Sequence, residues 1–97
     1  MSTLHIVSKS PYRTDALQRC LALVAPGDSI ILIEDGVFGV NLLTPDLKAL
    51  EEGIRCYALS EDLAARGLSA AAAGIRPTDY AGFVVLVCEH RNSLSHG

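Results

Sequence analysis

A serine followed by four aliphatic residues, at residues 29–33 (SIILI), constrains the fold more than any other segment of the chain. Such a run has the length of a strand and lacks the alternation of apolar and polar residues that a half-solvated strand shows. It is typical of a strand buried on both faces, as in a parallel sheet with helices above and below. The run therefore favours an α/β fold.

Further strand patterns occur before and after this run. Residues 3–7 and residues 54–59 have the length and composition of strands, and residues 74–77 fit a short fourth one. Helical patterns separate these segments, and strands that alternate with helices form a mostly parallel sheet. The sequence predicts a three-layer α/β/α architecture with a small sheet, built as a single domain over residues 1–97.

The first helical pattern covers residues 15–25. Its apolar residues fall on one face of a helix, and they are Leu17, Leu21 and Val24. Ser10 is a candidate N-cap, and Pro11 suits the first turn because its missing N–H would have no partner there. A helix beginning near Ser10 and ending before Gly27 is therefore expected.

Three more short helices are expected in the middle of the chain. One begins near Val37, and another occupies residues 44–50. A third begins at Ser60, which is a favourable N-cap. It ends at Gly67, because glycine adopts the left-handed conformation that terminates many helices.

Residues 80–88 fit both a buried strand and a helix. The strand interpretation rests on the β-branched composition, and the helical one on apolar residues at helical spacing after a cap at Thr78. We favour the helix, whose inward face would consist of Tyr80, Phe83, Val84 and Val87. A helix that is apolar nearly all round needs a second cover, and here another subunit is expected to provide it.

The composition agrees with a partner-bound domain and excludes several functions. Of the 97 residues, 49% are hydrophobic, which suggests that some surface is buried against partners, although a well-packed alanine-rich monomer would also fit. The eight Lys and Arg residues are scattered and the net charge is −3, which argues against direct nucleic-acid binding. No signal peptide and no apolar run of about 18 residues is present, so we expect a cytoplasmic protein without a membrane span.

Cys20 is the candidate functional residue. It borders the apolar stripe of the first helix, where it is either a core thiol or a half-exposed nucleophile. A reactive thiol needs a lowered pKa, and nearby cations such as Arg19 and Arg13 would help to lower it. Because Cys20 is not at the N-terminus of its helix, the helix dipole would not activate it strongly.

The other cysteines and the histidines indicate no metal site and no cofactor. Cys56 lies in a predicted central strand as an inert core residue, and Cys88 is expected in the core or in an interface. His5, in the first strand, is expected to be a structural histidine with satisfied hydrogen bonds. Neither His90 nor His96 stands at zinc-ligand spacing from another ligand.

Residues 8–10 (SKS) follow the first strand and offer one further possibility. A loop between a strand and a helix N-terminus can bind an anion. The glycine-rich phosphate-binding motifs are absent. A stand-alone anion-binding module is therefore a weaker alternative.

Four blocks of sequence, in this order, resemble the DsrH/TusB family of small sulfur-relay proteins. They span most of the chain: residues 4–12 (LHIVSKSPY), 34–37 (EDGV), 57–67 (YALSEDLAARG) and 79–84 (DYAGFV). The resemblance implies a DsrE/DsrF-like α/β fold. It also implies a cytoplasmic hetero-hexamer with DsrE/TusD-like and DsrF/TusC-like sister subunits, and a DsrC/TusE-like protein as the next sulfur acceptor.

The resemblance also implies a chemistry. Family members pass persulfide sulfur between cysteines, either for 2-thiolation of the wobble uridine in tRNA or in dissimilatory sulfur oxidation. Some DsrH-like members carry a cysteine in the first helix, and Cys20 matches that place, which favours Cys20 as a sulfur carrier and the sulfur-oxidation type. In the alternative, the chain is a non-catalytic scaffold subunit. The chain departs from the family at residues 91–97, because relatives commonly end in a strand that closes with an aromatic residue.

Overall fold

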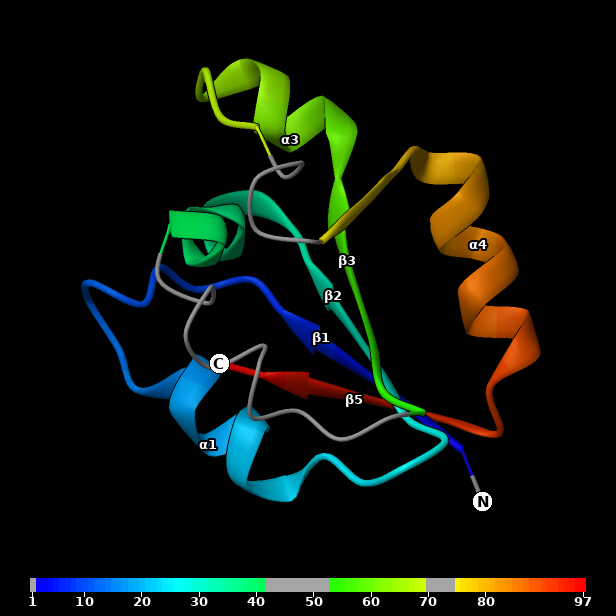
Figure 1. Ribbon diagram of the computed structural model, residues 1–97. Coiled ribbons are helices and arrows are strands. Elements are labelled where there is room, and N and C mark those ends of the chain that lie inside the picture. Colours follow the sequence, from blue (N-terminus) through cyan, green and yellow to red (C-terminus); the bar gives the residue numbers. More distant parts are fainter. Residues whose placement is uncertain (1, 42–52, 70–74) are drawn as a thin grey trace.

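The computed structural model describes residues 2–41, 53–69 and 75–97 of the chain. These residues form a five-stranded sheet in the order β4-β3-β2-β1-β5, and every neighbouring pair is parallel. The strands are β1 (Thr3–Val7), β2 (Ser29–Leu32), β3 (Arg55–Leu59), β4 (Arg76–Thr78) and β5 (Asn92–His96). Helices pack on both faces of the sheet (Figure 1), which confirms the predicted three-layer α/β/α architecture with a small parallel sheet.

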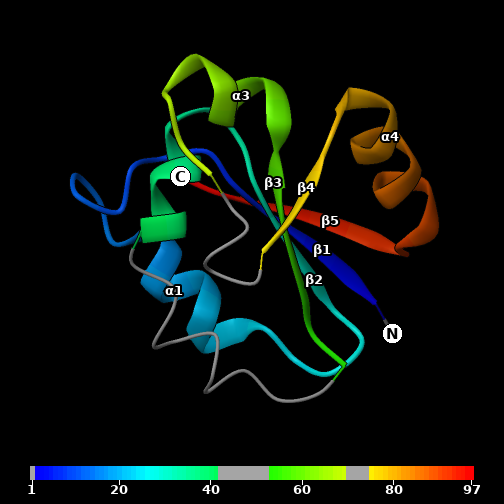
Figure 2. The same cartoon turned by 45° about the horizontal axis from the view of Figure 1, so that its top comes forward.

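The helices are divided unequally between the two faces. One face is covered by α1 (Ala16–Leu23), by the 3₁₀ helix η1 (Glu34–Asn41) and by α3 (Ser60–Ala65). The other face carries α4 (Tyr80–Glu89), which stands apart from the other helices in Figure 2. Within the described residues, no helix has the length and apolarity that crossing a membrane requires.

The handedness of crossover connections explains this division. From β1 to β4 the chain adds each new strand on the same side of the previous one, and then it returns across the sheet to place β5 beside β1. Parallel strands are joined by right-handed crossovers in nearly all proteins. A reversal of direction along the sheet therefore moves the connecting helix to the opposite face, which is where α4 lies.

The first helix is confirmed within residues 15–25, but Ser10 is not its cap and Pro11 is not in its first turn. Helix α1 begins at Ala16, and residues 11–13 form a turn instead of helix. The hydroxyl of Ser10 accepts a hydrogen bond from the amide of Tyr12, 3.2 Å away, and so it caps this turn. The Thr14 hydroxyl accepts from the amide of Ala16 at 3.3 Å. The expected inner face of the helix is confirmed at Leu17, which is buried.

Helix α3 ends as expected and begins differently. Gly67 has a φ of +65°, and the amide of Leu68 donates to the carbonyl of Leu63 at 2.9 Å, which is the glycine-terminated helix end that the sequence predicts. Ser60 is the first residue of the helix instead of its cap, and its hydroxyl donates to the carbonyl of Thr78. The helix predicted over residues 44–50 lies outside the described residues.

The predicted helix at residues 80–88 is confirmed as α4, but its inward face is wrong. Leu86 is its buried residue and Phe83 is partly buried, whereas Tyr80, Val84 and Val87 are exposed by 58%, 61% and 40%. The cap is Asp79 instead of Thr78, since the Asp79 carboxylate accepts from the amide of Gly82 at 2.8 Å. Because the helix is apolar on nearly every side, its sequence was compatible with more than one inward face.

We predict that α4 depends on Leu86 for its attachment to the sheet. Leu86 packs against Leu4 and Ile31, so Leu86→Ala should lower the free energy of unfolding by about 2–5 kcal/mol. Val85→Ala, on the same helix with a side chain exposed by 53%, should change it by less than about 0.5 kcal/mol. Denaturant unfolding of the isolated chain measures both values, and an equal loss in the two variants would contradict this packing.

Candidate functional site

Asp28 ties the end of the first helical segment to the sheet. Its carboxylate accepts hydrogen bonds from the amide of Thr3 at 3.0 Å, from the amide of Ala25 at 3.1 Å and from Nε2 of His5 at 3.0 Å. Burial raises the pKa of the Asp28 carboxyl, but these hydrogen bonds and the nearby His5 outweigh burial and hold it below its ordinary value. Asp28 is therefore a charged acceptor in the core, with each donor in a fixed place.

The sheet register brings His96 to the same region. His5 stands opposite Ile30 of β2, and Asp28 precedes Ile30 by two residues, so both point to the α1 face. On the other side of β1, His96 stands opposite Val7, two residues beyond His5 and on that same face. The strand that contains His96 has no strand-like sequence pattern, because residues 92–96 read NSLSH.

The two histidines form a chain of hydrogen bonds with Asp28. His5 Nδ1 and His96 Nε2 are 2.9 Å apart, and the rings are nearly parallel, with centroids at 5.2 Å and an interplanar angle of 25°. The Asp28 carboxylate can only accept, so Nε2 of His5 carries a proton, and in the neutral form of His5 the other nitrogen, Nδ1, accepts from His96. Burial lowers the pKa of His96, and the nearby His5 and Arg19 lower it further, so His96 is a neutral donor at neutral pH.

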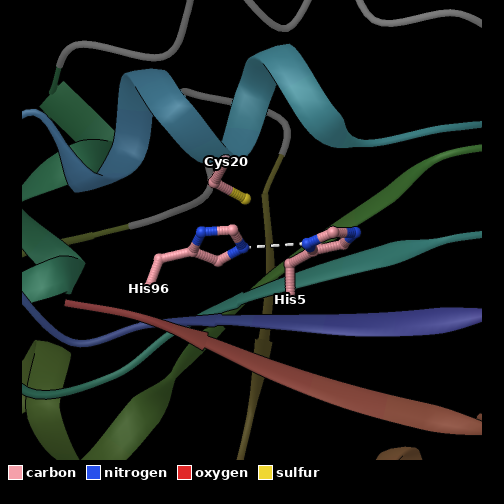
Figure 3. Close-up of side chains that lie close together, drawn as sticks. All are labelled: His5, Cys20 and His96. Atoms are coloured by element: carbon pink, nitrogen blue, oxygen red, sulfur yellow. Dashed lines mark hydrogen bonds between the residues drawn. The ribbon is translucent and has the colours of Figure 1, made fainter.

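Cys20 lies against the two rings from the helix side. Figure 3 shows its sulfur directed toward the imidazoles, and Sγ and one nitrogen of each ring lie within 4.8 Å of one another. The side chain is fully buried. Burial raises the pKa of the Cys20 thiol to about 12, and the Asp28 charge contributes to the rise. The sequence left open whether Cys20 is a core thiol or a half-exposed nucleophile, and in the structure it is a core thiol.

The other predicted residues lie elsewhere. Cys56 is a buried core residue as expected, and burial raises its pKa to about 12, with a smaller effect of Cys20. Cys88 was expected in the core or in an interface, and because it is exposed, the core position is wrong and the interface position stays a prediction. The reason is that α4 turns Leu86 and not Cys88 toward the sheet. Arg19 forms an exposed ion pair with Asp15 at 3.0 Å, which directs its guanidinium along the outer surface of α1.

The loop after β1 uses its amides internally. The amides of Arg13 and Thr14 both donate to the Ser10 carbonyl at 3.1 Å, and the amide of Tyr12 donates to the Ser10 hydroxyl. An anion at this loop would have to compete with these bonds. The geometry therefore gives no support to the anion-binding alternative for residues 8–10.

Two of the sequence blocks meet at the carboxyl ends of the strands. Nε and a terminal nitrogen of Arg66 donate to one carboxylate oxygen of Asp35, at 3.1 and 2.9 Å. Asp62 accepts from the amide of Glu34 at 2.7 Å, and Glu34 has a φ of +49°, a conformation that the contact fixes. The EDGV and EDLAARG blocks therefore hold η1 and α3 together. Their charged residues form hydrogen bonds and ion pairs with one another at the carboxyl ends of the strands.

Sequence reasoning missed Asp28 and His96 as members of the site. In the sequence, Asp28 lies between Gly27 and a predicted strand, and no motif marks it as a functional residue. His96 lies 91 positions from His5 in the sequence, and only the parallel pairing of β5 with β1 brings the two together. His5 was correctly expected to be a buried histidine with its hydrogen bonds satisfied.

The fold and the site define a small parallel α/β domain with a buried cysteine–histidine cluster. A family model described as "DsrH like protein" matches residues 9–93. The chain therefore belongs to the DsrH-like family, as the four sequence blocks indicated.

Curated relatives and a solved structure agree with this assignment. Protein TusB of Escherichia fergusonii is 38% identical over 94 residues, which cover 95% of this chain and 98% of that protein. Protein TusB of Escherichia coli O1:K1 / APEC is 37% identical with the same coverage. The solution NMR structure of protein Tm0979 from Thermotoga maritima superposes with a TM-score of 0.64 at 26% identity, covering 90% of this chain and 92% of that one.

We predict that the three thiols differ sharply in reactivity in the folded chain. Iodoacetamide should modify exposed Cys88 first, whereas Cys20 and Cys56 should be protected by burial. Raising the pKa of each buried thiol from 9.0 to about 12 lowers its thiolate fraction about a thousandfold. Peptide mass spectrometry after a timed reaction measures the rates, with guanidinium-unfolded chain as the control. Modification of Cys20 as fast as Cys88 would contradict the buried position.

Proposed function

We propose that the protein is a subunit of a cytoplasmic sulfur-relay complex. The observation that carries the proposal is the match to the DsrH-like family and to proteins named TusB over nearly the whole chain. Sulfur relay by persulfide exchange needs no metal and no organic cofactor, because a thiolate attacks the outer sulfur of a persulfide and becomes a persulfide itself. It does need partner proteins that supply and accept the sulfur.

We assign the complex to the tRNA 2-thiolation type. Relatives at 37–38% identity carry the name TusB, which belongs to the branch that serves the wobble uridine. Cys20 taken alone favoured dissimilatory sulfur oxidation. Identity over 94 residues is broader support than one cysteine, so tRNA thiolation is the proposed pathway.

The exposed side of α4 supports a hetero-oligomer. Tyr80, Val84 and Val85 are exposed by 58%, 61% and 53% on one short helix. Apolar side chains gathered in this way on a small domain are typical of an interface. We propose that the sister subunits, DsrE/TusD-like and DsrF/TusC-like, cover this helix in a hetero-hexamer, and that a DsrC/TusE-like protein accepts the sulfur.

Within the complex, two roles for this chain remain distinct. In the first, Cys20 carries the sulfur, as its place in the first helix suggests. Because Cys20 is fully buried beneath α1, this role requires α1 to move when the partners bind. In the second, the chain is a scaffold and a sister subunit carries the sulfur, and the burial of Cys20 favours this second role.

The pathway is tested by complementation in a bacterium that lacks its own TusB. Expression of this chain together with its sister subunits should restore 2-thiouridine in tRNA, measured by nucleoside mass spectrometry. Val85→Asp should fail to restore it, because it places a charge in the proposed interface while leaving the core of the chain intact. Val85→Ala is the matched control. An assembled wild-type complex that restores no 2-thiouridine would show that the pathway is wrong.

The role of Cys20 is tested in the assembled complex. After treatment with a persulfide donor, the Cys20 peptide of a carrier subunit should gain the mass of one sulfur atom, and Cys20→Ser should lower sulfur transfer to the acceptor at least tenfold. Cys88→Ser is the matched thiol control, and because Cys88 lies on the exposed side of α4, its sulfur transfer is compared only in complexes shown to be fully assembled. If Cys20 stays unmodified and Cys20→Ser transfers sulfur as the wild type does, the carrier role is wrong and the chain is a scaffold subunit.

A further inference from the structure

Three potential metal ligands converge in the core between α1 and the sheet. They come from three separate elements: His5 from β1, Cys20 from α1 and His96 from β5. Their relative exposures are 3%, 0% and 7%, and the three ligand atoms lie within 4.8 Å of one another. Figure 3 shows the sulfur and both rings turned toward a common point.

We propose that His5, Cys20 and His96 form a binding site for a Zn²⁺ ion. Three protein ligands of the N₂S type leave a fourth tetrahedral position, which a water molecule fills in many zinc sites. Imidazole and thiolate are ligands for zinc and its neighbours in the transition series, whereas Mg²⁺ and Ca²⁺ require oxygen ligands. The proposal goes beyond the sulfur relay, which needs no metal.

Binding of the ion requires the three ligand atoms to move, because the two nitrogens are too close together and the sulfur is known only to lie within 4.8 Å of them. Zinc binds imidazole nitrogen at about 2.0–2.1 Å and thiolate sulfur at about 2.3 Å. In a tetrahedron these lengths place two nitrogens about 3.3 Å apart and a nitrogen and a sulfur about 3.6 Å apart. His5 Nδ1 and His96 Nε2 are now 2.9 Å apart, and they must separate by a few tenths of an ångström to admit the ion. His96 lies on β5, which among the described strands pairs with β1 alone, so a small shift of its ring breaks no ladder to a second strand.

Asp28 orients His5 for this role. Histidine ligands of zinc commonly donate their second ring N–H to a carboxylate, which fixes the tautomer and the direction of the ring. His5 Nε2 donates to Asp28 Oδ2 at 3.0 Å, so the lone pair of Nδ1 faces His96 and the thiol. The backbone amides of Thr3 and Ala25 hold Asp28 in turn. Asp28 is thus a positioning residue and not a ligand.

The charges of the site balance when zinc is bound. With zinc bound, both imidazoles are neutral, because each gives the lone pair of one ring nitrogen to the metal. Zinc binding releases the thiol proton to solvent and moves the His96 proton from Nε2 to Nδ1. The Cys20 thiolate and the Asp28 carboxylate then offset the two positive charges of the ion. A neutral total suits a buried site, where an uncompensated charge is costly.

The sulfur of Cys20 cannot be a metal ligand and a persulfide carrier at the same time. Sulfur transfer is therefore measured with a chelator present, and metal binding is measured without a sulfur donor. The two experiments then have independent outcomes. Absence of zinc binding leaves the sulfur-relay proposal unchanged, and absence of sulfur transfer leaves the zinc proposal unchanged.

The test is a titration of the full chain, stripped of metal and kept reduced, with Co²⁺ as a spectroscopic substitute for Zn²⁺. We expect one Co²⁺ per chain, an absorption band from thiolate-to-cobalt charge transfer, the visible bands of tetrahedral cobalt, and loss of all of these when Zn²⁺ is added. Cys20→Ser should abolish the charge-transfer band, and His96→Gln should weaken binding at least tenfold. Asp28→Asn should weaken it about 10–100-fold, as expected for a residue that orients a ligand.

Cys88→Ser is the matched control and should bind like the wild type, because Cys88 is exposed and on the other face of the sheet. A second measurement guards against variants that fold poorly. Zn²⁺ should raise the Tm of the wild-type chain and of Cys88→Ser, and it should leave the Tm of Cys20→Ala unchanged. A wild-type chain without a charge-transfer band, or a band that survives Cys20→Ser, would overturn the proposal.

Discussion

Strand β1 pairs with β2 on one edge and with β5 on the other, and the chain reverses its direction across the sheet to make the second pairing. Because crossovers are right-handed, this reversal places α4 on the face opposite to α1, η1 and α3. The same reversal brings β5 next to β1, and so it brings His96 to His5. The position of α4 on its own face and the buried cysteine–histidine cluster are thus two results of one topological step.

The residues that identify the family have mainly structural roles in this chain. Asp35, Asp62 and Arg66 form the network that joins η1 to α3, and Asp79 caps α4. Polar groups at the carboxyl ends of parallel strands often bind ligands. Here they bond to one another, and the cysteine lies instead in the core beneath α1. Any chemistry of Cys20 therefore depends on what opens that core or on what can enter it.

The sequence predicted the elements whose patterns are local. Residues 29–33 identified the buried strand, and Gly67 identified the end of α3. In both cases the residues of the segment themselves determine its local structure. The predicted inward face of α4 was wrong because every residue from Phe83 to Val87 is apolar, so helical spacing could not distinguish Leu86 from Val84. Strand β5 was missed since its residues gain their conformation from pairing with β1 and not from their own β-propensity. The cluster of His5, Cys20 and His96 could not be found without that strand.

The two edges of the sheet differ in what they offer to another chain. Strand β4 is three residues long and contains Pro77, which has no amide hydrogen to donate, so this edge is poorly suited to extension. Strand β5 has five residues and no proline, and its outer edge faces away from β1. Among the described strands, β5 therefore offers another polypeptide a longer template than β4 does, and growth of the sheet is favoured in that direction. That direction leads away from α3 and η1 and begins beside the strand that carries His96.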